Sequence, residues 1–190
     1  MKIVIRKFLW YKFLNSLFLG LSIGSIFTLY TPLNPSIYSM GGVILALGML
    51  FIAKQYSKIL NIDAFYKISL LVEFVLLFGI LYFLLFSYSY TTALIVYVGY
   101  QITFVFGSYL VRAETLFLKY KKAIELVDVV KQKGYLVGML LSYSFYQLLE
   151  HFFKITDNQI QVYWIHYLLL LSQLFIIMML ILSFRKKSDL

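Results

Sequence analysis

Apolar stretches of about 20 residues recur along the whole chain, separated by short segments that hold most of its charge. Each residue of a helix adds ~1.5 Å, so such a stretch crosses the ~30 Å hydrocarbon core of a bilayer. Six stretches are predicted to span a membrane: residues 8–30, 37–53, 65–86, 91–111, 133–153 and 162–184. We therefore expect an all-α integral membrane protein that forms one domain over residues 1–190.

Composition supports this prediction. Hydrophobic residues make up 62% of the chain and charged residues 13%, compared with roughly 45–50% and ~25% in ordinary soluble domains. So few polar side chains cannot cover a water-facing surface, and the excess apolar surface must face lipid. The sequence has no cysteine, which removes disulfides, thiolate metal sites and thiol catalysis.

Positive charge is concentrated on one side of the predicted spans. Of the 17 lysines and arginines, 16 lie at the N-terminus, in residues 54–67, in residues 112–133 or in the tail 185–187, and the opposite loops hold only Lys154. Basic residues resist translocation, so this side is expected to be cytoplasmic and to hold both termini (N-in/C-in). The net charge of +9 then reports topology, and no nucleic-acid partner is expected.

The longest cytoplasmic segment, residues 113–131, has a helical pattern of its own. Ile124 and Val127 belong to an apolar face, while Lys121 and Glu125 lie on another. This pattern predicts an amphipathic link that lies at the membrane surface. The alternative is a plain cytoplasmic extension of the fourth or fifth span.

No enzyme-like arrangement of residues is present in the sequence, so we expect no catalytic residue, no metal site and no cofactor. Glu73 is nevertheless unusual, because it lies inside the third predicted span. An acid at the centre of a membrane helix costs ~2.5–3.5 kcal/mol, and such residues usually serve a purpose. Proton coupling, cation coordination and a structural hydrogen bond are the roles that we consider for Glu73.

Polar and small residues form stripes at helical spacing. The polar stripes include Tyr11, Asn15 and Ser22 in the first span, Tyr97 and Gln101 in the fourth, and His166 and Gln173 in the sixth. Lipid cannot satisfy their hydrogen bonds, so these faces should point into the protein. The small residues include Gly20 and Gly24 in the first span, Gly41 and Gly48 in the second, and Gly134 and Gly138 in the fifth. Such residues let helices approach closely.

The segment after the second predicted span carries a family resemblance. Residues 50–59 resemble the loop motif of the major facilitator superfamily, Gly-x-Leu-Ala-Asp-Arg-Tyr-Gly-Arg-Arg, at Ala53, Tyr56 and Lys58. The chain departs from that motif at Leu50, Lys54 and Ser57. The stretch that begins with Arg112 and Glu114 is similar to the family's link into its fifth helix.

With its rhythm of short outer turns and a long inner link, the chain resembles one six-helix half of such a transporter. The resemblance implies two three-helix units in inverted orientation, a 3+3 inverted repeat. It implies that the first and fourth helices face a substrate path, for which the candidates are Asn15, Ser22, Tyr97 and Gln101. It further implies a seam between halves on the second and fifth helices, for which the candidates are Gly41, Gly48, Gly134 and Gly138. Glu73 would then lie on a peripheral helix.

The leading expectation is secondary transport of a small solute in a bacterial inner membrane, by a homodimer or with a second half-size subunit. A second candidate is a substrate-binding membrane subunit, similar to the six-helix vitamin-binding components of energy-coupling uptake systems. Gly20 and Gly24 of the first span could then dock the partner. A third candidate is a membrane assembly or scaffold protein that does not transport.

Overall fold

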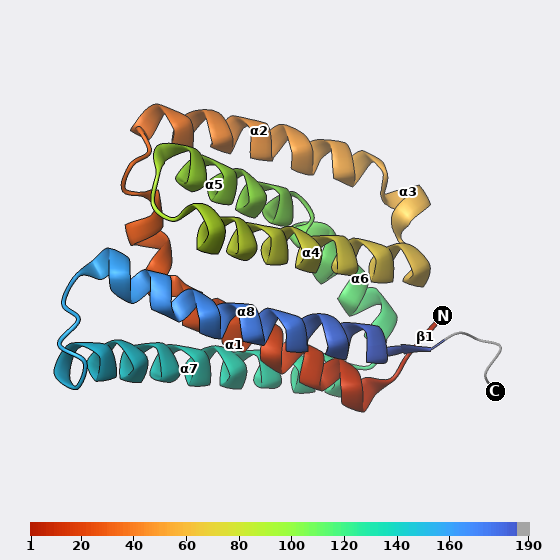
Figure 1. Cartoon of the computed structure of the whole chain (residues 1–190). Coiled ribbons are helices and arrows are strands. Elements are labelled where there is room, and N and C mark those ends of the chain that lie inside the picture. Colours follow the sequence, from red (N-terminus) through yellow and green to blue (C-terminus); the bar gives the residue numbers. More distant parts are fainter. Residues whose placement is uncertain (186–190) are drawn as a thin grey trace.

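The computed structural model describes residues 1–185, and all long elements in this range are helices (Figure 1). The elements are β1 (Lys2–Ile3), α1 (Ile5–Tyr30), α2 (Pro35–Lys54), α3 (Tyr56–Ile59), α4 (Ile62–Phe86), α5 (Tyr90–Val105), α6 (Gly107–Leu118), α7 (Lys121–His151), α8 (Asn158–Leu182) and β2 (Phe184–Arg185). The all-α prediction is confirmed. Lys186 and Lys187 of the basic tail lie outside the described residues.

Polar side chains start three of the long helices by satisfying free backbone N–H groups. Asn61 accepts a hydrogen bond from the N–H of Ala64 at the start of α4, and Ser89 accepts one from Thr92 at the start of α5. Asp157 accepts two at the start of α8. The starts of these three helices are therefore encoded locally.

Five segments are long and apolar enough to cross a membrane: α1, α2, α4, the combined α5 and α6, and α8. Their number and composition indicate a multi-pass membrane protein. Helix α7 is not in this group, because its 31 residues combine an apolar part with a charged beginning. The sixth span therefore stays a prediction.

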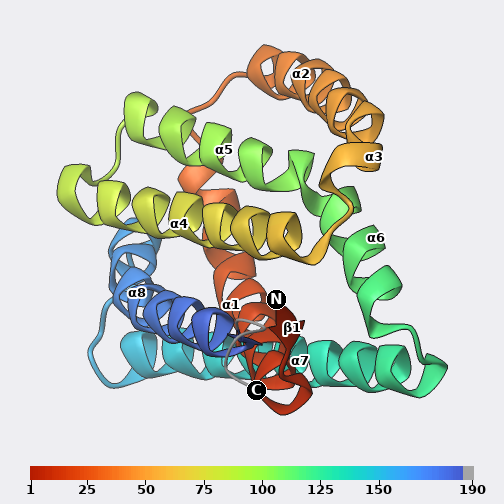
Figure 2. The same cartoon turned by 90° about the vertical axis from the view of Figure 1, so that its right-hand side faces the viewer.

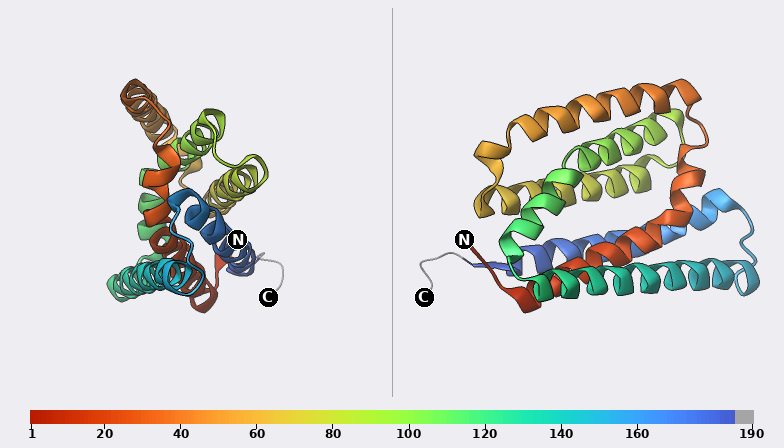
Figure 3. Two further views of the ribbon diagram at one scale, coloured as in Figure 1. Left: turned by 60° about the vertical axis from the view of Figure 1, so that its left-hand side comes forward. Right: turned by 180° about the vertical axis from the view of Figure 1, so that it is seen from behind.

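The long helices form two rows (Figure 2; Figure 3, left). In one row, α1 lies between α7 and α8, and in the other α5 lies between α2 and α4. Contact between α4 and α8 joins the rows. The antiparallel pair of β1 and β2 brings both described ends of the chain to the same end of the helices.

The segment 113–131 differs from the predicted surface helix. Its first residues continue α6, and the residues from Lys121 onward are the first turns of α7. The chain turns between them at Lys119, whose φ is 57°. Val127 is almost fully buried, since it packs into the core rather than onto lipid headgroups. The segment thus extends both neighbouring helices.

Backbone contact joins α1 to α7. A Cβ atom at Gly134 would overlap the carbonyl oxygen of Phe13, and one at Gly138 would overlap that of Leu17. Without side chains, the two helices come close enough for backbone atoms to touch. The order of these contacts also shows that α1 and α7 run parallel.

The other predicted seam glycines also lie against a helix of the same chain. A Cβ atom at Gly41 would meet the ring and hydroxyl of Tyr97, and one at Gly48 would meet the side chain of Val105. They join α2 to α5, which run parallel too. All four glycines thus close helix pairs within one chain, and a seam between two chains at these positions stays a prediction.

Candidate functional site

Glu73 lies in the middle of α4, where that helix faces both α1 and α8. Only 1% of its surface is exposed. It is the innermost acid among the described residues, since Glu114 lies near the end of α6 and the other acids are exposed. Polar side chains of α1 and α8 surround it.

Three side chains donate hydrogen bonds to the Glu73 carboxylate. The hydroxyl of Tyr11 and the Nδ2 of Asn15, both on α1, donate to Oε1 at 2.9 and 3.0 Å. From α8, the Nε2 of Gln173 donates to Oε2 at 2.8 Å and to the backbone oxygen of Glu73 at 2.9 Å. An ionised carboxylate is an acceptor only, so these donors match its charged form.

Gln173 also keeps an unused acceptor beside this carboxylate. Its side chain is fully buried, and its Oε1 has no hydrogen-bond partner among the described residues. A buried polar atom without a partner costs about 1–3 kcal/mol. A flip of the amide would turn this oxygen towards the carboxyl group, where it can accept a proton carried by the acid.

A second carboxylate ties together three helices at the basic end of the molecule, where α1 and α7 begin and α6 ends. Glu114 of α6 is 5% exposed. Its Oε2 lies 2.5 Å from the Nζ of Lys12 on α1, and its Oε1 pairs with Lys131 on α7. Lys131 also lies 3.5 Å from the exposed Asp128. Glu114 lies on α6, which continues α5 of one row, while the two lysines lie on α1 and α7 of the other row. This triad is therefore an ionic link between the rows.

Adjacent residues of α1 connect the two carboxylates. Tyr11 bonds to Glu73, and its neighbour Lys12 bonds to Glu114. The Lys12 ammonium lies 5.1 Å from the centre of the Tyr11 ring. Glu73, at mid-helix, is therefore linked to the basic end of the molecule through two consecutive residues.

The four predicted substrate-path residues do not share one cavity. Asn15 bonds to Glu73, while the buried hydroxyl of Ser22 donates to the backbone of its own helix. Tyr97 and Gln101 line a groove between α2 and α5. The Oε1 of Gln101 has no partner among the described residues. Asn15 therefore lies at the Glu73 carboxylate, whereas Tyr97 and Gln101 lie in the groove between α2 and α5.

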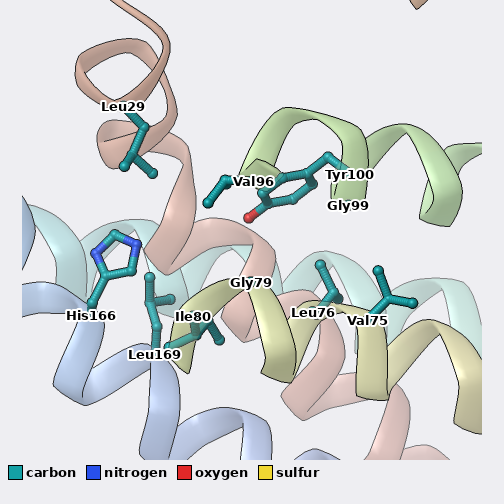
Figure 4. Close-up of a pocket in the computed structure, with 10 residues that line it drawn as sticks. All are labelled: Leu29, Val75, Leu76, Gly79, Ile80, Val96, Gly99, Tyr100, His166 and Leu169. Carbon is teal, nitrogen blue, oxygen red and sulfur yellow. The ribbon is translucent and has the colours of Figure 1, made fainter. Parts of the chain in front are cut away.

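A small cavity lies among α1, α4, α5 and α8 (Figure 4). Tyr100 and His166 are the polar residues on its wall, and Gly79 and Gly99 provide its space. The Nδ1 of His166 lies 2.6 Å from the carbonyl oxygen of Val162, which holds the ring proton on that nitrogen. At about 20 Å³, the cavity has room for about one water.

The residues of the loop motif lie at the end of α2 and in α3. Ala53 and Lys58 are exposed, whereas Tyr56 packs beside the ring of Tyr109 on α6. The hydroxyl of Tyr109 donates to the backbone oxygen of Ile59 at 2.8 Å, which holds this loop against α6. Arg112 is exposed and faces away from Glu114, so these two predicted residues have different surroundings.

Sequence reasoning missed the partners of both acids. No local pattern pairs Lys12 or Lys131 with Glu114, because the two ends of each pair are 17 residues apart or lie on distant helices. Gln173 was placed on an inward face, and its heptad spacing from His166 was the available signal. Comparisons with protein-family models, curated proteins and solved structures find no match to this chain.

Proposed function

We propose that the chain is one half of a secondary transporter of the major facilitator type. In this proposal it crosses a bacterial inner membrane six times, with α7 as the fifth span and both termini in the cytoplasm. It moves a small solute as a homodimer or with a second half-size subunit.

The pattern of helix pairing carries this proposal. Counted as spans, the first (α1) packs on the fifth (α7) and sixth (α8), and the fourth (α5) packs on the second (α2) and third (α4). If the first span is exchanged with the fourth, the second with the fifth and the third with the sixth, the first set of pairs becomes the second set. The α4–α8 contact turns into itself, and both close pairs, α1–α7 and α2–α5, run parallel. Two three-helix units of inverted topology would pair in this way.

We propose Glu73 as the coupling site, although the family resemblance alone would put it on a peripheral helix. It lies at the α4–α8 contact, which is where the two proposed units meet, and halfway along its span. Transporters built from inverted repeats hold substrate and coupling ions near the midplane at the repeat interface. This position favours a functional role for Glu73 over a purely structural one.

The surroundings of Glu73 favour a proton as the coupling ion. In the ionised form, Tyr11, Asn15 and Gln173 donate to it. When Glu73 is protonated, its O–H needs an acceptor, and both the Gln173 Oε1 and the rotated Tyr11 hydroxyl can serve. Proton binding and release therefore proceed without leaving the carboxyl group unsatisfied.

The alternative of a vitamin-binding subunit has less support. Its ligand would need an enclosed pocket within one chain, whereas the cavity beside His166 accommodates about one water. Its docking helix would offer Gly20, but a Cβ atom there would overlap backbone atoms of Tyr135 and Met139 on α7. In the half-transporter, the solute lies between two chains, so neither restriction applies.

Transport in proteoliposomes tests the proposal. Purified protein is reconstituted and challenged with pools of labelled amino acids, sugars and organic acids under an inward proton gradient. The expected result is accumulation of at least one pool by the wild type. Glu73→Gln should abolish accumulation driven by the gradient and retain exchange of preloaded solute.

Glu150→Gln is the matched control, because Glu150 is an exposed acid near the C-terminal end of α7, far from the Glu73 carboxylate. It should transport like the wild type. If wild-type vesicles neither accumulate nor exchange any of the pools, the proposed transport is contradicted. Accumulation by Glu73→Gln at the wild-type rate contradicts proton coupling at Glu73.

A further inference from the structure

A groove runs between α1 and α7 at the basic end of the molecule. Leu9, Trp10 and Phe13 of α1 and Val130 of α7 form its apolar wall, and Arg6 lies at its end. Its volume is about 240 Å³. The groove is adjacent to the contact of Phe13 with α7 and is separate from the Glu73 and Glu114 networks.

The polar end of the groove is positively charged. Arg6 is exposed in the first turn of α1, and no ion pair in the described residues includes it. Lys133, one turn after Val130 on α7, is exposed as well. It does not line the groove and lies at the level of Phe13, since its neighbour Gly134 contacts that residue, and its long side chain can extend back towards Arg6. Asp128, an exposed acid on α7, already pairs with Lys131. An anionic group at the Arg6 end would meet the guanidinium group and would gain charge-assisted hydrogen bonds.

The aromatic residues indicate where the groove lies relative to the membrane. Trp10 is 54% exposed, and its ring lies edge-on against Phe13 at 5.8 Å. Tryptophan is enriched at the boundary between headgroups and hydrocarbon. With Arg6 one turn towards the cytoplasm and Phe13 one turn towards the bilayer, the groove passes from charged to apolar across this boundary.

We propose that this groove is a binding site for an anionic phospholipid of the cytoplasmic leaflet. The phosphate binds Arg6, with Lys133 nearby, and one acyl chain lies along Leu9, Phe13 and Val130. Basic pockets between membrane helices on the cytoplasmic side have this chemistry. A protein partner would match the apolar wall but would not explain the gradient from charge to hydrocarbon. The lipid also bridges α1 and α7, which it holds together whether or not the chain transports.

The chain has two tryptophans, Trp10 and Trp164, and this makes a direct test simple. Trp164→Phe leaves Trp10 as the only fluorophore. The protein is reconstituted in phosphatidylcholine mixed with brominated phosphatidylglycerol or brominated phosphatidylcholine, which quench tryptophan on contact. From the quenching of Trp10, we expect the site to bind phosphatidylglycerol at least three times more strongly than phosphatidylcholine.

Two matched variants locate the effect. In the Trp164→Phe background, Arg6→Gln should remove the preference, so that the two lipids bind about equally. Arg6→Lys should retain most of the preference. Trp10→Phe leaves Trp164, which lies exposed near the start of α8 at the opposite end of the helices, and should show no preference. If Arg6→Gln fails to fold, Lys133→Gln should lower the preference in part.

Equal quenching of Trp10 by the two lipids overturns the proposal. An unchanged preference in both Arg6→Gln and Lys133→Gln overturns it too, because the selectivity would then come from general surface charge. A preference of the same size at Trp164 has the same consequence.

Discussion

The two parallel helix pairs, α1–α7 and α2–α5, have matching places in the pairing pattern but differ in how closely they pack. In the first pair, glycines contact backbone atoms, and α1 has nine buried residues. In the second, glycines contact only side chains, and Gly41 is the one buried residue of α2. The α1–α7 pair is therefore rigid, while α2 is held loosely and exposes most of its surface.

This difference separates the polar networks from the uncovered apolar surface. The polar residues around Glu73 and Glu114 belong to α1 and its neighbours, where a rigid frame holds hydrogen bonds at fixed lengths. The α2–α5 side offers a groove and an apolar surface that lipid or a second chain can cover. We infer that the first region carries the ion chemistry and that the second adjusts to a partner.

The largest expected effect compares leucine at equivalent glycines. Gly138→Leu should destabilise the protein by more than about 3 kcal/mol, because backbone atoms of α1 cannot move aside. Gly41→Leu should cost about 1–2 kcal/mol, because the side chain of Tyr97 can rotate away. Thermal unfolding of the two variants in mild detergent measures the difference. Equal losses would mean that the two pairs are equally rigid.

Removing the link between the rows should have the next largest effect. Glu114→Gln leaves Lys12 buried without its counterion, and we expect a loss of about 3 kcal/mol. Asp128→Asn, which removes the exposed partner of Lys131, should change stability by less than about 1 kcal/mol. Denaturant titrations at pH 7 compare them. A Glu114→Gln protein as stable as Asp128→Asn would exclude the triad as a link between the rows.

At Glu73, stability and coupling should separate. Glu73→Gln preserves volume, and a flipped Gln173 can accept from the new amide, so stability should fall by less than about 1 kcal/mol. Glu73→Leu leaves the donors of Tyr11, Asn15 and Gln173 unpaired and should cost at least about 2 kcal/mol. The same unfolding assay ranks the two. If leucine is tolerated as well as glutamine, the hydrogen bonds to Glu73 contribute little.

The smallest effect should come from Gly42→Ala. An added Cβ at Gly42 meets nothing within 4 Å, so this variant should unfold within about 0.5 kcal/mol of the wild type. Gly134→Ala, which meets the backbone of Phe13, is its counterpart on the rigid pair and should be clearly destabilised. A destabilised Gly42→Ala would indicate that another chain packs on that face of α2.

The sequence was sufficient for the helices and for their inward faces, because both follow from apolar length and from the spacing of polar residues such as Gln173. It placed Glu73 inside a span for the same reason. It could not identify Lys12 as the partner of Glu114, since that pair depends on how α1 and α6 meet in space. Small residues at regular spacing indicate that helices approach closely, but not which ones, so the contact of Gly138 with Leu17 of α1 could not be predicted.

The proposed pair of inverted three-helix units requires α7 to cross the membrane. Because the sequence has no cysteine, single cysteines can be introduced directly at Thr156, after α7, with Asn34→Cys and Lys122→Cys as outer and inner controls. Intact spheroplasts are then treated with a maleimide that cannot cross the membrane. We expect Thr156→Cys to be labelled like Asn34→Cys, while Lys122→Cys reacts only after lysis. Protection of Thr156→Cys until lysis would leave both ends of α7 on the same side and would contradict the inverted repeat.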